Sequence, residues 1–297
     1  MSIVIKNISK NFKEIKALKN IDLKFEENQI TGLIGFNGSG KTTTFNILTN
    51  IIEAYEGNVC IEQNGALRKI TQNDRWKMSY LSSGTDPQNF EKVVKHFNFV
   101  GGIYGLSKKQ VLKRIEEIVN ILDFKSNLNI RAKNLSKGNQ QKIKIISTFI
   151  NPDAKYIFLD EPFDGLDPIM VKKLSDYFYE QRKDKTIVIT SHRMDIVDQI
   201  CDSFFILKEG KIVERKKATE KSNLFLVTNI DAPIEKIEKM KEVLSISKNQ
   251  KEIYVEVVSQ EHYKILANKL ITEDKCKFVS LKEKGLTESV FERYADE

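Results

Sequence analysis

The feature that most constrains the fold is a glycine-rich stretch between a predicted strand and a predicted helix. Residues 35–42 read Gly-Phe-Asn-Gly-Ser-Gly-Lys-Thr, which fits the pattern G-x-x-x-x-G-K-[ST]. The apolar segment Ile30–Ile34 before it is typical of a buried strand. Apolar residues at helical spacing follow the loop: Phe45, Leu48, Ile51 and Ile52. A strand, a loop and a helix in this order favour an α/β fold with a largely parallel sheet.

The loop has the residue types that binding a polyphosphate requires. Glycines let the backbone wind closely around an anion, and the positive end of the following helix favours the same anion. We expect Lys41 to reach the β- and γ-phosphates and the Thr42 hydroxyl to ligate Mg²⁺. The other expected phosphate-binding residues are Gly35, Asn37, Gly38, Ser39, Gly40 and Thr43. The alternative is an ordinary glycine-rich turn, against which the flanking strand and helix argue.

A second predicted strand, Tyr156–Asp160, ends in two adjacent acids, Asp160 and Glu161. A carboxylate at the end of a buried apolar strand is unfavourable unless it has a partner. In an α/β sheet, the carboxyl ends of the strands meet at the crevice that binds the ligand. Asp160 is therefore predicted to hold Mg²⁺, directly or through water. Glu161 is predicted to accept a proton from the attacking water. The alternative is that Asp160, Glu161 and Pro162 only begin a turn.

The composition and the distribution of charged residues predict a globular protein with no membrane-spanning helix. The 297 residues are 40% hydrophobic and 30% charged, which excludes a disordered or fibrous chain. The longest stretch without Asp, Glu, Lys or Arg covers residues 28–40, too short for a spanning helix, and we see no signal peptide. The net charge of +7 indicates either a solvated lysine-rich surface or anionic partners. Three widely spaced cysteines fit a reduced, cytoplasmic compartment.

The chain divides into two predicted domains. Residues 1–215 alternate strands and helical patterns, with further strands at residues 185–190 and 203–207 and a helical insertion at about 84–150. Residues 107–110 form a capping-box pattern within this insertion. Residues 216–222 are a predicted linker, and residues 223–297 carry strand and helix patterns in an order that suggests a small βαββαβ domain. A closing helix is predicted to begin near Thr287.

Five ordered motifs narrow the class. They are the loop at 35–42, Ser136-Lys137-Gly138, Asp160-Glu161, Asp164-Gly165-Leu166-Asp167, and Thr190-Ser191-His192. Together with Phe12, they make residues 1–215 resemble the ATP-binding subunit of an ABC transporter. The resemblance implies a P-loop NTPase fold, with a RecA-like core, an antiparallel β part and a helical insertion. Residues 278–291 resemble the ending common in bacterial exporters of drugs, sodium ions and antimicrobial peptides, which implies a ferredoxin-like α+β accessory domain.

The resemblance also implies roles for matching residues. Phe12 would stack on adenine, with packing on the core as its alternative. Ser136 and Gly138 would donate to the γ-phosphate held by a second ATPase subunit, and Asp167 would cross the interface between the two. His192 would contact the γ-phosphate, so that Glu161, His192 and Lys41 form the catalytic set.

Four positions depart from the family pattern, one of them Asn139, which stands in place of the usual glutamine. Ser83 stands where the family has a glutamine that contributes to the Mg²⁺ shell, so Ser83 is a doubtful metal ligand. The alternative is that Gln88 extends to the metal in its place. Lys137 replaces a glycine, and either adds charge near the opposing phosphates or faces solvent. Asp164 replaces a small residue.

These features predict an ATP-hydrolysing subunit that powers a separate integral-membrane permease from the cytoplasmic face of the membrane. The expected cofactors are ATP and Mg²⁺, the expected second subunit is a copy of this chain or a related one, and no nucleic acid is expected. Export of a peptide, a drug or another amphipathic substrate is the preferred function. The alternatives are a soluble ABC ATPase acting on nucleic acid or ribosomes, and a degenerate nucleotide-binding regulator.

Overall fold

The computed structural model describes residues 1–82, 92–192, 194–217, 223–229, 237, 240–241, 243–248, 252–257, 260–272 and 279–284. The chain divides into two compact units, Met1–Lys217 and Ala218–Glu297. Among the described residues, no helix combines the length and the apolar character needed to span a lipid bilayer.

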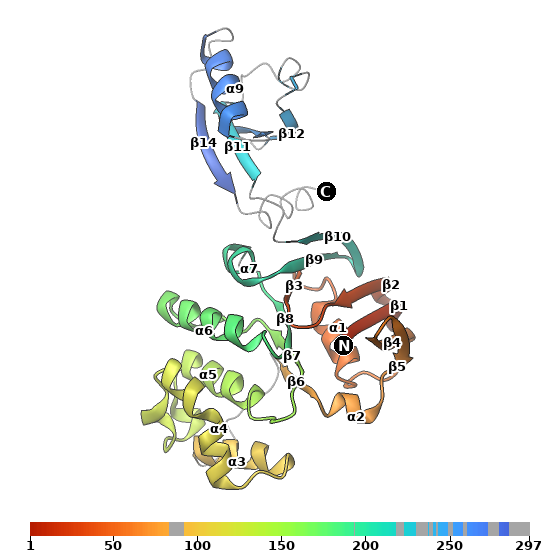
Figure 1. Cartoon of the computed structure of the whole chain (residues 1–297), viewed down its shortest axis with the longest axis vertical. Helices are drawn as coiled ribbons and strands as arrows, with labels where there is room; N and C mark the ends of the chain where they lie inside the picture. The colour runs from red at the N-terminus through yellow and green to blue at the C-terminus, as the bar shows by residue number, and fades with distance from the viewer. Residues whose placement is uncertain are drawn as a thin grey trace. The chain divides into compact units, whose positions relative to one another are not determined.

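A six-stranded sheet forms the centre of the first unit (Figure 1). Its strands, in spatial order, are β10 (Lys211–Lys217), β9 (Ser203–Lys208), β3 (Ile30–Ile34), β8 (Thr186–Thr190), β7 (Tyr156–Asp160) and β6 (Met78–Leu81). All neighbours are parallel except β10, which pairs antiparallel with β9. Every residue of β3, β7 and β8 is buried, as expected for a sheet covered on both faces. The predicted, largely parallel α/β core is confirmed.

A second, antiparallel sheet packs against the first around helix α1 (Lys41–Leu48). Its strands, in spatial order, are β2 (Ile15–Phe25), β1 (Ser2–Phe12), β4 (Glu56–Gln63) and β5 (Ala66–Lys69). The rings of Phe25 and Phe205 pack edge to face, with their centroids 6.2 Å apart. The ring centroids of Phe45 on α1 and Phe158 on β7 lie 5.4 Å apart. The first contact joins the two sheets, and the second fixes α1, and with it the loop before it, against the central sheet.

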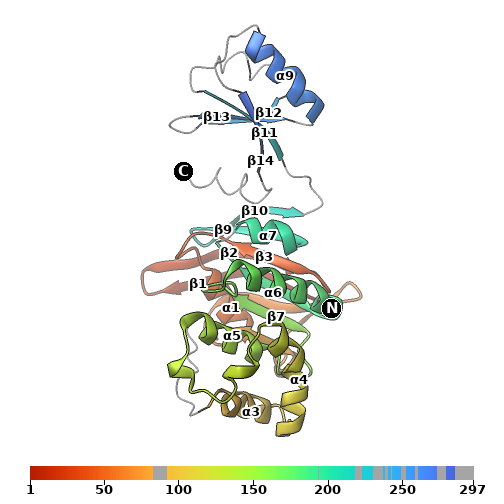
Figure 2. The ribbon, with the colours of Figure 1, turned by 90° about the vertical axis from the view of Figure 1, so that its left-hand side faces the viewer.

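A group of three helices lies away from the antiparallel sheet in both ribbon views (Figures 1 and 2). These helices are α3 (Val93–Ile103), α4 (Lys108–Ile121) and α5 (Lys137–Thr148). Short 3₁₀ turns at Lys125–Asn127 and Ala132–Asn134 connect α4 to α5. Ser107 and Gln110 form the predicted capping box at the start of α4. The remaining helices of this unit are α2 (Gln72–Arg75), α6 (Pro168–Gln181) and α7 (Met194–Ile200).

The second unit contains an antiparallel sheet and a helix. In spatial order its strands are β12 (Val243–Lys248), β13 (Glu252–Val257), β11 (Asn223–Asn229) and β14 (Val279–Lys284). Helix α9 (Gln260–Thr272) buries Leu266 and Leu270 in one cluster with Ile253 and Val255. This order, with the second strand at the edge and the first in the middle, is that of a ferredoxin-like βαββαβ sheet. The helix predicted near Thr287 lies outside the described residues.

The connection between the units starts later than residue 216. Strand β10 runs through Lys217, which pairs with Ser203 of β9, so the first two residues of the predicted linker are part of the sheet. The ladder to β9 continues past the change in composition that marked the linker, because backbone hydrogen bonds do not depend on side-chain polarity.

Candidate active site

The glycine-rich loop lies between β3 and α1, and its backbone requires glycine at two positions. Gly38 and Gly40 adopt φ angles of +81° and +112°, in the left-handed region. A Cβ at Gly40 would stand 2.7 Å from the Ala17 carbonyl oxygen and 2.6 Å from a methyl carbon of Leu18. Gly40 therefore lets the loop approach β2 closely as it enters the helix.

The side chain of Lys41 folds back over the glycine-rich loop and binds its backbone. Its Nζ donates to the carbonyl oxygens of Gly35 at 2.7 Å and Phe36 at 3.1 Å. Burial lowers the pKa of Lys41, while the charges of Glu161 and Asp160 oppose that shift. The buried hydroxyl of Ser39 has no hydrogen-bond partner among the described residues. A loop with a cation and an unpaired hydroxyl donor fits an anionic ligand.

Asp160 lies at the carboxyl end of β7 and is 3% exposed. Its two carboxylate oxygens accept hydrogen bonds from the hydroxyls of Thr42 at 2.9 Å and Thr190 at 2.7 Å. Thr190 in turn accepts from the backbone N–H of Glu161 at 2.9 Å. Thr42 and Asp160 thus bring together the hard oxygen donors that Mg²⁺ prefers, and this donor set fits that ion.

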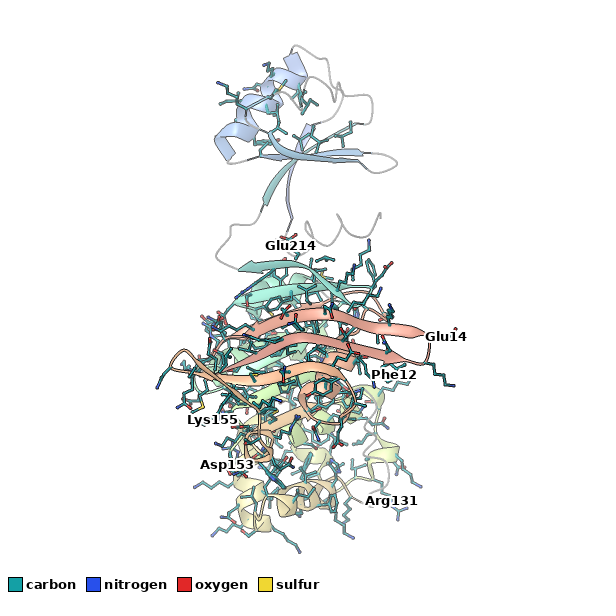
Figure 3. All side chains as sticks on the ribbon, turned by 90° about the vertical axis from the view of Figure 1, so that its right-hand side faces the viewer. Phe12, Glu14, Arg131, Asp153, Lys155 and Glu214 are labelled. Carbon is teal, nitrogen blue, oxygen red and sulfur yellow. The ribbon has the colours of Figure 1, made fainter. Side chains whose placement is uncertain are left out.

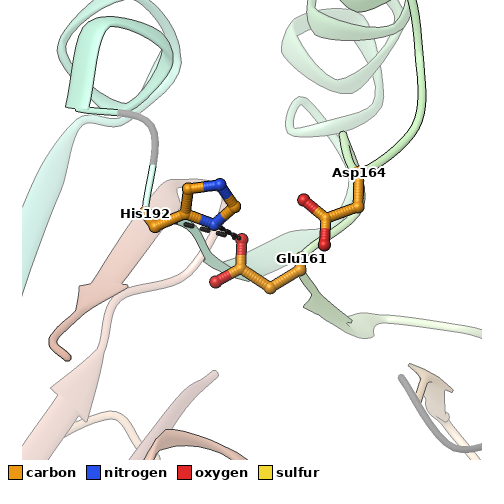
Figure 4. A group of neighbouring side chains, drawn as sticks. All are labelled: Glu161, Asp164 and His192. Carbon is orange, nitrogen blue, oxygen red and sulfur yellow. Dashed lines mark hydrogen bonds and ion pairs between the residues drawn. The ribbon is translucent and has the colours of Figure 1, made fainter. Parts of the chain in front are cut away.

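Glu161 holds the centre of a three-residue cluster (Figure 4). Its Oε2 lies 3.0 Å from His192 Nδ1 and accepts from the His192 backbone N–H at 3.3 Å. Ligand atoms of Glu161, Asp164 and His192 all lie within 4.8 Å of one another. Burial raises the pKa of Glu161, His192 and Lys41 oppose that shift, and Asp164 adds to it. Glu161 also has a φ of +49°, a strained backbone that the surrounding hydrogen bonds hold.

One cavity of about 310 Å³ joins these parts. Its lining includes these residues of the predicted set: Asn37, Gly38, Gly40, Lys41, Thr42, Thr43, Asp160 and Glu161. The strand order explains why these residues lie together. Strand β8 lies between β3 and β7, and the carboxyl ends of all three strands lie at the same edge of the sheet. The structure therefore brings the loop, both acids and His192 together from three separate segments.

Ser136 and Gly138 are not among the described residues that line this cavity. Ser136 caps α5, and its hydroxyl accepts from the Asn139 backbone N–H at 3.3 Å. A Cβ at Gly138 would stand 2.5 Å from the Gly165 carbonyl oxygen, so the start of α5 touches the segment after Glu161. Within one chain, these residues do not meet the glycine-rich loop.

Phe12 and Asp167 also lie outside the lining of the cavity. Phe12 ends β1 with 44% of its surface exposed, and Lys10 Nζ stands 4.9 Å from the ring centroid (Figure 3). Asp167 caps α6, accepting from the N–H groups of Ile169 and Met170 at 3.0 Å, with Pro168 in the first turn. Ser83 and Gln88 lie outside the described residues.

Two supporting residues have contacts that the sequence does not predict. Thr190 holds Asp160 and Glu161 together, and Gln141 Nε2 donates to the carbonyl oxygens of Glu161 at 3.1 Å and Pro162 at 3.3 Å. A polar residue ending a buried strand is a signal for Thr190, but its partner follows only from the pairing of β8 with β7. Gln141 lies on α5, and its contact with the backbone after Glu161 follows only from how that helix packs.

Comparisons with known proteins agree with this geometry. The family model described as "ABC transporter" matches residues 18–164. An uncharacterised ABC transporter ATP-binding protein of Methanocaldococcus jannaschii is 39% identical over 217 residues, which are 72% of this chain and 77% of that protein. The human phospholipid-transporting ATPase ABCA3 is 32% identical over 219 residues, 71% of this chain but 12% of that protein.

A solved structure described as the ATP-binding subunit of an ABC transporter has the same fold. It superposes with a TM-score of 0.63 at 25% identity, covering 73% of this chain and 90% of that one. With a glycine-rich loop, a paired acid site and a relative this similar over most of its length, the chain belongs to the ATP-binding subunits of ABC transporters and carries their ATPase domain.

Proposed function

We propose that this chain hydrolyses ATP, with Mg²⁺, at a site completed by a second ATPase subunit, and that the cycle drives export through a separate membrane permease. The observation that carries the proposal is the cavity of about 310 Å³ that joins the phosphate-type loop to Asp160 and Glu161. It provides binding groups for a polyphosphate on one wall and a carboxylate base on the other.

Binding of ATP begins with the loop. Its backbone N–H groups and the amino end of α1 favour the phosphates. Lys41 exchanges its contacts to the Gly35 and Phe36 carbonyl oxygens for phosphate oxygens, which are stronger acceptors because they are charged. The unpaired Ser39 hydroxyl gains an acceptor in the same step. Phe12, exposed at the end of β1, is proposed to stack on the adenine ring.

Hydrolysis then depends on the two acids. When bound by Thr42 and Asp160, Mg²⁺ supplies positive charge that offsets the charge growing on the phosphates. Glu161 accepts the proton of the attacking water, and burial, which raises its pKa, makes it a stronger base than an exposed glutamate. His192 already contacts Glu161 and is proposed to exchange that contact for the γ-phosphate.

Two copies of the site are needed because each chain holds Ser136 and Gly138 away from its own cavity. Ser136 is exposed at the amino end of α5, where a helix terminus favours an anion. We infer that these residues reach the γ-phosphate held by a partner, which is a second copy of this chain or a related one. ATP then acts as the link between subunits.

The transported substrate is proposed to be a peptide, a drug or another amphipathic molecule. The exporter-like ending at residues 278–291 supports this, as does the likeness to a relative named as phospholipid-transporting. The permease is proposed to be a separate membrane protein, with this chain bound to it at the cytoplasmic face of the membrane. The two alternatives named from the sequence have no support in the comparisons, because the relatives are named as transporter proteins.

The direct test of the ATP site is Lys41→Ala. The variant is expected to lose most of its affinity for ATP in calorimetry, because the only cation lining the cavity among the described residues is removed. Lys109→Ala, at an exposed position on α4, serves as the control. Affinity equal to that of the parent would contradict the assignment of the loop.

A further inference from the structure

Three lysines form a row at the edge of the sheet opposite the ATP site. Lys77, Lys155 and Lys185 immediately precede β6, β7 and β8. The residues that follow them are paired, Met78 with Tyr156 and Tyr156 with Thr186. The backbone N–H of Lys155 donates to the Lys77 carbonyl oxygen at 2.8 Å. Because neighbouring strands lie about 4.8 Å apart, three cationic side chains start side by side.

Arg114 of α4 adds a fourth cation to this row. Its guanidinium donates to the carbonyl oxygens of Phe149 and Asn151, both at 3.3 Å, so it is positioned by backbone rather than by a carboxylate. Burial lowers the pKa of Lys185 and the charge of Arg114 lowers it further, while Asp184 and Glu117 oppose the shift. Like charges held close together repel, so a further anion between them is favourable.

The four cations line a groove of about 700 Å³. Asp153 and Asp184 also line it, so the cations outnumber the carboxylates. Trp76 belongs to the same wall; it is 51% exposed and its edge meets Tyr104 at 6.2 Å. Figure 3 shows Asp153 and Lys155 on the side of this unit opposite Phe12. No described residue lines both this groove and the cavity at the glycine-rich loop, so the groove is separate from the ATP site.

We propose that this groove binds a ligand that carries a phosphate group, either a free phosphate ester or a phospholipid headgroup. Ammonium and guanidinium groups are the side chains that bind phosphate, and several of them converge here from different elements. The exposed indole beside them offers an apolar surface on which a base or an acyl chain rests. The groove also has the volume of a small-molecule site.

The chain contains a single tryptophan, so the fluorescence of Trp76 reports on this groove. The full chain is first saturated with a non-hydrolysable ATP analogue and Mg²⁺, which fills the ATP site. Inorganic tripolyphosphate is then titrated, and in a second series vesicles of phosphatidylcholine with and without phosphatidylglycerol. A saturable response to tripolyphosphate assigns a free phosphate ligand, and a response only to the anionic vesicles assigns a lipid headgroup.

One variant combines three substitutions in the row: Lys77→Gln, Lys155→Gln and Lys185→Gln. The control variant combines three substitutions at exposed positions of α4: Lys108→Gln, Lys109→Gln and Lys113→Gln. The first set is expected to weaken binding at least about tenfold, because each charge-assisted contact is worth about that factor. The control set is expected to bind like the parent. Lys155→Gln alone, at an exposed position, replaces the first set if that set fails to fold.

Two results overturn the proposal. One is a Trp76 signal that stays unchanged with both tripolyphosphate and anionic vesicles. The other is equal affinity in the parent and in the variants of the row.

Discussion

Single hydrogen bonds decide how this site is arranged before ATP arrives. Asp160 accepts from Thr42 and Thr190, Lys41 donates to its own loop, and Glu161 contacts His192. These groups therefore have protein partners that they can exchange for ATP or Mg²⁺, whereas the Ser39 hydroxyl has none among the described residues. An exchange of this kind keeps buried polar groups satisfied in both states.

The assignment of the base is tested by Glu161→Gln. Glutamine keeps the shape of the side chain but cannot accept the proton, so ATP turnover is expected to fall about 10²–10⁴-fold while ATP binding is retained. Phosphate release and nucleotide binding are measured on the same preparation. Glu180→Gln, at an exposed position on α6, should change neither. Parent-like turnover in Glu161→Gln would show that another group activates the water.

The role of Thr190 is tested by Thr190→Val. The buried Asp160 oxygen and the Glu161 N–H both lose a partner, so the free energy of unfolding is expected to fall by about 1–3 kcal/mol. Urea unfolding measures this change. Thr190→Ser keeps the hydroxyl and is expected to lie much closer to the parent. Equal stability of the two variants would mean that this hydroxyl does not hold the acids in place.

Among the elements, the short helix α2 shows how local charges secure the edge of the first unit. Asp74 accepts from both terminal nitrogens of Arg68, at 2.6 and 2.8 Å, and from the N–H and hydroxyl of Thr71. These contacts tie α2 to β5. Arg75 of α2 donates to the Leu48 carbonyl oxygen at 2.9 Å, which links the same helix to the end of α1.

This network predicts a pH dependence. The hydrogen bonds from Arg68, followed by those from Thr71, hold the pKa of Asp74 well below its usual value of 3.8. A depressed pKa stabilises the fold above the unfolded value, and that stabilisation is lost as the pH falls toward the folded pKa. Asp74→Asn is therefore expected to cost about 1–3 kcal/mol near neutral pH.

The difference in unfolding free energy between parent and Asp74→Asn is expected to shrink as the pH is lowered from about 5 toward 3. Urea unfolding over this range measures it, with Asp176→Asn at an exposed position of α6 as the control. A difference that stays constant over the range would contradict the assigned pairing with Arg68.

Element types followed from sequence more directly than their arrangement. The continuous apolar runs of β3 and β7 and the capping box of α4 were predictable because burial and capping act through neighbours in the chain. Strand β12 was not assigned individually; of its side chains that the structure describes, Val243 and Ile246 pack on the core of the second unit. The contact of Thr190 with Asp160 depends on strand order, which spacing along the chain does not reveal.

At the scale of the whole molecule, we propose that one chain contains both halves of an ATP site without bringing them together. The glycine-rich loop and the acids meet in one cavity, while Ser136 and Gly138 lie outside it. Because Gln141 binds the backbone after Glu161, the helix that begins at Ser136 is connected to the acids of its own chain. We infer that closure on a partner's ATP is transmitted to those acids through this connection.

The most direct test is the mass of the Glu161→Gln variant in solution, measured by light scattering during gel filtration with ATP and Mg²⁺. Because this variant is expected to bind ATP without turning it over, it should have twice the mass of the single chain with ATP and the mass of one chain without it. Ser136→Glu, which places a negative charge against the partner's phosphates, should prevent the change. A variant that is loaded with ATP and still has the mass of one chain would contradict the shared site.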